Sequence, residues 1–106
     1  MLAIIYSYKV VCIMFVITEA HLRALSQLSI VGLFSKEVTF DRILSFLPVS
    51  LSVEGRVYNL LLCWTGGMWR VSYVSDVCMD IQLHSSYSGD LVMALIDTLR
   101  WLQTVS

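Results

Sequence analysis

The feature that most constrains the fold is a pair of adjacent glycines between two apolar segments. Gly66 and Gly67 separate residues 57–64 from residues 68–74, and both segments are rich in aliphatic and aromatic residues. Two consecutive glycines suit a two-residue hairpin turn, because such a turn needs positive φ at both positions. The sequence therefore predicts a β-hairpin in which Thr65 pairs with Met68.

The register set by this turn agrees with the hydrophobic pattern. A slip of one residue would exchange the two faces of the hairpin, so this agreement supports the pairing. One face receives large apolar side chains in the pairs Trp64–Trp69, Leu62–Val71 and Leu60–Tyr73. The other face receives the pairs Cys63–Arg70, Leu61–Ser72 and Asn59–Val74. We expect the first face to form the core, although its aromatic rings would also suit stacking on nucleic-acid bases.

Helix caps and apolar periodicity predict three helices. Thr18 is the cap candidate of the first, whose leucines recur at helical spacing before Gly32. The second follows Thr39 and ends before Pro48, because proline disfavours helix in the residue that precedes it. Ser88 is the cap candidate of the third, which carries a leucine stripe and extends to about residue 103.

A third strand is expected over residues 77–84, where apolar and polar residues alternate. Its apolar edge would consist of Val77, Met79, Ile81 and Leu83. Residues 18–106 then form one two-layer α+β domain in the order α-α-β-β-β-α. We expect an antiparallel three-stranded meander covered by the C-terminal helix.

Residues 1–17 form an apolar N-terminal segment that is open to four interpretations. As a membrane anchor it is slightly short and carries Lys9 near its middle. As a signal peptide it would be cleaved near residues 18–20. Its β-branched residues also suit a buried strand, and Met14 would be a natural first residue if residues 1–13 are an upstream extension.

Charge and composition indicate which kinds of partner the chain can bind and in which compartment it is expected. The formal net charge is −1, and no basic stripe is present, so specific binding of nucleic acid is not expected. Charged residues make up 14% of the chain and hydrophobic residues 58%, which excludes a disordered protein. We expect a cytoplasmic protein, with membrane association through residues 1–17 as the alternative.

No constellation of catalytic or metal-ligating residues is recognisable. Cys12, Cys63 and Cys78 form no C-x-x-C pair, and we expect Cys63 and Cys78 to be thiols on two strands. On one strand, Cys78 and His84 would lie about 20 Å apart, too far to bind one ion together with Asp80. We therefore predict no metal, no cofactor and no enzymatic activity.

The order helix, three strands, helix over residues 39–103 resembles that of the double-stranded-RNA-binding domain and, more loosely, that of HicB-type antitoxin domains. The resemblance concerns architecture alone and implies a compact α+β fold. Double-stranded-RNA binders carry clustered lysines at the start of their last helix. Residues 89–93 of this chain include Asp90 and no basic residue, so the resemblance does not extend to phosphate binding.

Small size and excess apolar surface favour a small non-enzymatic binding or regulatory protein that acts through protein–protein contacts. An inhibitor or antitoxin of a phage or mobile element fits this description, and a small membrane-anchored protein is the alternative. The expected partner is another protein or a second copy of the chain, because a symmetric dimer would hide apolar surface. The candidate partner-binding residues are Leu61, Arg70, Val74 and Trp101.

Overall fold

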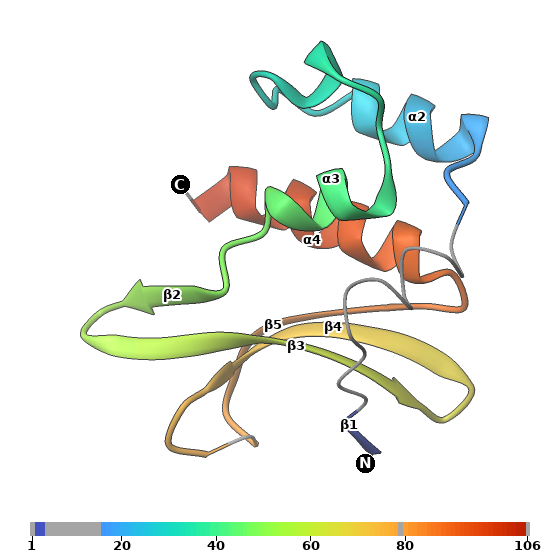
Figure 1. The fold of residues 1–106 in the computed structure, drawn as a ribbon. Helices are drawn as coiled ribbons and strands as arrows, with labels where there is room; N and C mark the ends of the chain where they lie inside the picture. Colours follow the sequence, from blue (N-terminus) through green and yellow to red (C-terminus); the bar gives the residue numbers. More distant parts are fainter. Residues whose placement is uncertain (1, 4–15, 79, 106) are drawn as a thin grey trace.

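An antiparallel sheet with helices on one side makes up the described part of the chain (Figure 1). The computed structural model describes residues 2–3, 16–78 and 80–105. In chain order the elements are β1 (Leu2–Ala3), α2 (Glu19–Ser26), the 3-10 helix η1 (Leu33–Ser35), α3 (Phe40–Ser45), β2 (Ser50–Val53), β3 (Arg56–Thr65), β4 (Met68–Ser75), β5 (Gln82–Ser88) and α4 (Leu91–Val105). The predicted α+β class is confirmed, with the C-terminal helix α4 packed on the sheet.

The β3–β4 hairpin has the predicted turn and the predicted register. Thr65 pairs with Met68, Trp64 with Trp69, and every further pair down to Asn59 and Val74 follows in step. Gly66 and Gly67 have φ of 59° and 80°, which is the left-handed conformation that the turn requires. Turn chemistry and side-chain pattern thus specify the same pairing.

The sheet has five strands among the described residues instead of the predicted three, because the two short strands β1 and β2 both pair with β3. β2 pairs with β3 in antiparallel fashion from Ser50–Asn59 to Val53–Arg56. The connection is a second tight turn, in which Glu54 and Gly55 have φ of 51° and 78°. At four residues β2 is too short for its alternation to be distinctive, and it is specified largely by pairing with the longer β3.

The last strand lies later in the chain than predicted. β5 covers Gln82–Ser88 instead of residues 77–84, and it pairs with β4 from Val74–Gln82 to Trp69–Ser88, with a register shift next to Tyr73. Of the expected apolar edge, Val77 and Ile81 precede β5 and are 89% and 43% exposed, and Met79 lies outside the described residues. The small Ser86 side chain lets α4 approach β5 closely, as the Thr98–Ser86 hydroxyl contact of 3.2 Å shows.

Capping and burial account for the helices. Thr18 caps α2 and Thr39 caps α3, each by accepting a backbone N–H as predicted. α4 begins at Leu91, so its cap is Asp90 instead of the predicted Ser88: the Asp90 carboxylate accepts the Val92 N–H, while the Ser88 hydroxyl accepts the Asp90 N–H. Helix α2 ends at Ser26, before Gly32, and Leu22 of its expected stripe is 36% exposed.

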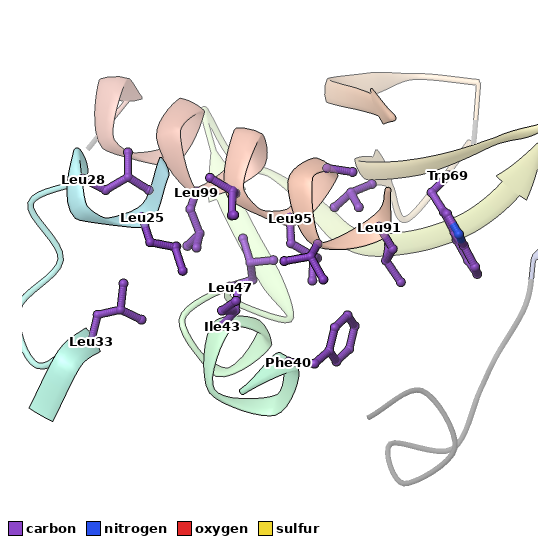
Figure 2. Close-up of a cluster of buried hydrophobic side chains, with 14 residues drawn as sticks. Leu25, Leu28, Leu33, Phe40, Ile43, Leu47, Trp69, Leu91, Leu95 and Leu99 are labelled. Carbon is purple, nitrogen blue, oxygen red and sulfur yellow. The ribbon is translucent and has the colours of Figure 1, made fainter. Parts of the chain in front are cut away.

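The core lies between the helices and one face of the sheet (Figure 2). Leucines of α4 meet Leu25 of α2, Ile43 of α3 and the hairpin residues Trp69 and Val71. The hairpin face that was predicted to be core is therefore the face toward α4. Trp64, at the end of the hairpin, is 41% exposed and contacts Trp69 edge to face.

Most of the apolar N-terminal segment, residues 1 and 4–15, lies outside the described residues. The hypotheses for residues 1–17 therefore stay predictions. Leu2 and Ala3 form β1 and pair with Trp64 and Cys63 of β3. Ile17 packs against the core, and Val16 is 77% exposed. Among residues 2–3, 16–78 and 80–105, no helix is both long and apolar enough to cross a membrane.

Candidate interaction surface

The four predicted partner-binding residues do not share one surface. Leu61, Arg70 and Val74 lie on the sheet face turned away from α4, as their register positions require. Leu61 is half-buried, whereas Arg70 and Val74 are only 6% and 5% exposed. Trp101 is half-buried on α4, on the opposite side of the sheet. Their role in binding a partner stays a prediction.

Arg70 is an unusual residue for a buried position in a sheet. Its Nε and Nη2 atoms are buried and have no hydrogen-bond partner among the described residues. These two nitrogens lie on one edge of the guanidinium, the edge that commonly holds the two oxygens of a carboxylate. A buried charge without a partner is destabilising, because it has lost its hydration without gaining hydrogen bonds.

A polar cluster joins β5 to the second half of α4. The His84 ring stacks on the Trp101 ring, with centroids 4.3 Å apart and an interplanar angle of 10°. His84 Nε2 lies 2.7 Å from Ser86 Oγ, and Thr98 donates to the same oxygen. Burial lowers the pKa of His84, and the charge of Asp97 opposes that effect.

The His84–Ser86 pair has the residue types of a base and a nucleophile, but its surroundings favour a structural role. Ser86 is 7% exposed beneath α4, so its hydroxyl is poorly placed to meet a substrate. A catalytic serine needs an accessible oxygen beside its base. We interpret the pair as part of the contact that seats α4 on the sheet.

The described residues hold no group of three or more potential metal ligands. Cys78 and Asp80 lie in the loop before β5, so the expected placement of Cys78, Asp80 and His84 on one strand is wrong. Cys63 is buried in β3 and Cys78 is exposed, and the two sulfurs are not bonded to each other. Shallow hollows lined by described residues lie on the helical layer, for example beside Arg42 and Phe34.

The outer edge of β5 is the most distinctive surface of the described chain. In the sheet order β1-β3-β4-β5, β5 is a terminal strand whose only neighbour among the described residues is β4. A terminal strand presents unpaired backbone N–H and C=O groups that can pair with another chain. Natural proteins usually protect such an edge with charges, proline or a short strand. β5 is seven residues long and contains no Asp, Glu, Lys, Arg or Pro, and its register shift lies at its start, so residues 84–88 pair regularly with β4.

The register identifies which backbone groups of β5 point outward. Hydrogen-bonded pairs alternate along an antiparallel ladder. In a two-residue turn the flanking residues Thr65 and Met68 form a hydrogen-bonded pair, so the backbone N–H and C=O of Met68 point toward β3. The backbone groups of residues 69, 71, 73 and 75 of β4 therefore point toward β5. The bond of 2.8 Å from Ser75 N to Ile81 O follows this alternation. Val71 pairs with Ser86 and Tyr73 pairs with His84, so the backbone groups of Ser86 and His84 point toward β4. The alternate residues Ser85 and Tyr87 therefore have their backbone groups on the outer edge.

The side chains of Ser85 and Tyr87 lie next to this edge, on the sheet face away from α4. Tyr87 lies opposite Arg70 and is 51% exposed. Ser85 lies opposite Ser72, and their hydroxyl oxygens are 2.9 Å apart. Sequence reasoning missed this site because it ended the strand at His84. The available signal was the absence of charge between Asp80 and Asp90.

Comparisons of the chain with protein-family models, with curated proteins and with solved structures give no match. The function of the chain is therefore inferred from its own geometry. Within that geometry, the outer edge of β5 combines free backbone groups, a half-exposed tyrosine and an uncharged strand.

Proposed function

We propose that this chain is a small non-enzymatic protein-binding module whose docking element is the outer edge of β5. The observation that carries the proposal is an uncharged seven-residue terminal strand with the backbone groups of Ser85 and Tyr87 on its outer edge. A strand of a partner protein would extend the sheet by one strand, a recurring mode of recognition.

The energetics of such docking suit this edge. Each new backbone hydrogen bond contributes about 0.5–1.5 kcal/mol net, so several are needed together with side-chain burial. Tyr87 supplies that burial, because about half of its side chain remains exposed beside the edge. β5 itself is held by β4 and by α4, so little ordering is required on binding.

The test is capture of proteins from an extract of the source cells by the tagged full-length chain. Tyr87→Pro removes an outward N–H while leaving the ladder to β4 intact, since proline is tolerated where the N–H faces away from the sheet. Phe34→Ser is the matched control, because Phe34 is 52% exposed on the helical layer, far along the chain from β5.

We expect at least one protein, which can be the untagged chain itself, to be retained by the wild type and by Phe34→Ser. The same protein should be lost with Tyr87→Pro. Retention that is equal for all three forms, or retention of no protein by the wild type, would contradict the proposal. Circular dichroism of each variant establishes that the fold is intact.

A further inference from the structure

We infer that the occupant of the β5 edge is a second copy of this chain, an inference that rests on the proposed function. Two β5 strands pair antiparallel about a two-fold axis at Ser85, the middle residue of Gln82–Ser88. The axis is perpendicular to the sheet, because that is the two-fold operation that pairs identical edges antiparallel. The two sheets become one continuous sheet, with both helical layers on the same side.

The strand is self-complementary in this register. The outward backbone groups of Ser85 meet those of Ser85 in the second copy, and Tyr87 lies two residues from the axis, in the regularly paired part of β5. On the face away from α4, the small Ser85 side chains lie at the axis. Tyr87, 51% exposed in one copy, there lies against the strand of the second copy, so the pairing buries aromatic surface twice.

Charge also favours a second copy as the partner. A two-fold axis places each residue near its own copy, so a charge near the middle of β5 would meet a like charge. β5 has no Asp, Glu, Lys or Arg. Next to it, α4 carries Asp97 and Arg100, joined by a contact of 2.9 Å. This pair carries no net charge, so it adds no repulsion between two copies.

Charge substitution at the axis provides the test, with the full-length chain and sedimentation velocity. Ser85→Lys and Ser85→Glu each place two like charges opposite each other in the dimer. We expect a dimeric wild type, a dissociation constant raised at least about tenfold in each variant, and a restored dimer when the two variants are mixed in equal amounts. Ser26→Lys, on the exposed end of α2, should remain dimeric.

Tyr87→Ser is a second variant that avoids charge at the partly buried Ser85, and it should also weaken the dimer. A wild type that is monomeric at high micromolar concentration would overturn the inference, as would Ser85→Lys that stays dimeric. If the wild type is monomeric but retains another protein that Tyr87→Pro loses, the second-copy inference fails and the proposed function stands. If the wild type retains no protein at all, both fail.

Discussion

His21 Nε2 lies 2.6 Å from Asp90 Oδ2 and thereby ties the first described helix to the start of the last one. The backbone N–H of Thr18 donates to His21 Nδ1, so Nε2 is the nitrogen that donates to the carboxylate. The same carboxylate accepts the N–H of Val92 at the start of α4. One buried imidazole therefore completes the cap of α2 and orients the cap of α4.

This link predicts energetic coupling between His21 and Asp90. His21→Ala should lower the free energy of unfolding by about 1–2 kcal/mol, because a cap bond and a charge-assisted bond are lost. In a double-mutant cycle with Asp90→Ala, urea denaturation should give a coupling energy of about 1 kcal/mol. Strictly additive effects would show that the two side chains do not interact in solution.

The Gly66-Gly67 turn predicts a contrast between two substitutions. Gly66 has φ of 59°, and an added Cβ would meet no heavy atom within 4 Å, so backbone strain alone is tested. Gly66→Val should cost about 1–2 kcal/mol, while Gly66→Asn should cost a few tenths, because asparagine tolerates the left-handed region. Thermal unfolding measures both, and equal stability of the two variants would rule out the proposed turn geometry.

Replacing Arg70 by an uncharged side chain of similar size is expected to stabilise the folded chain. Arg70→Met keeps much of the side-chain volume and eliminates two buried nitrogens that lack hydrogen-bond partners in the described part of the chain. We expect the free energy of unfolding to rise by about 1–3 kcal/mol, whereas Arg70→Lys, which retains a charge, should bring no gain. A loss of stability in Arg70→Met would mean that the guanidinium has an acceptor in solution.

The buried Tyr73 side chain is expected to make the folded chain less stable at alkaline pH. Burial raises the pKa of Tyr73 to about 12, and its hydroxyl donates to the Pro48 carbonyl. An unfolded chain loses the tyrosine proton near pH 10, so the stabilisation is complete below that pH. It is then lost as pH rises from 10 to 12. Tyr73→Phe should flatten this part of the urea-denaturation profile, and Tyr87→Phe, at an exposed tyrosine, should leave it unchanged.

Local signals made the hairpin and the helix caps predictable from sequence. The φ requirement of Gly66 and Gly67 fixes the turn, and the turn fixes the pairing as far as Asn59 and Val74. Thr18 and Thr39 are caps because each precedes an apolar helical pattern. Each of these features depends on residues that are close together in the chain.

β5 was misplaced because its position depends on distant contacts. Residues 77–84 have the cleaner alternation, yet the structure leaves Val77 in a loop and pairs the serines of β5 with β4. Ser86 is placed by its contact with α4, whose Thr98 reaches the Ser86 hydroxyl. The candidate docking edge was missed because the strand was misplaced, whereas the shared face of Leu61, Arg70 and Val74 followed directly from the hairpin register.

The most direct test of the docking edge is amide hydrogen exchange, resolved by residue with NMR, at several concentrations of the full-length chain. We predict that the amides of Ser85 and Tyr87 are protected in concentrated samples and lose that protection on dilution. The amide of Ser86, which faces β4, should stay protected at every concentration. Fast exchange of Ser85 and Tyr87 at all concentrations, with Ser86 protected throughout, would contradict pairing of two β5 strands.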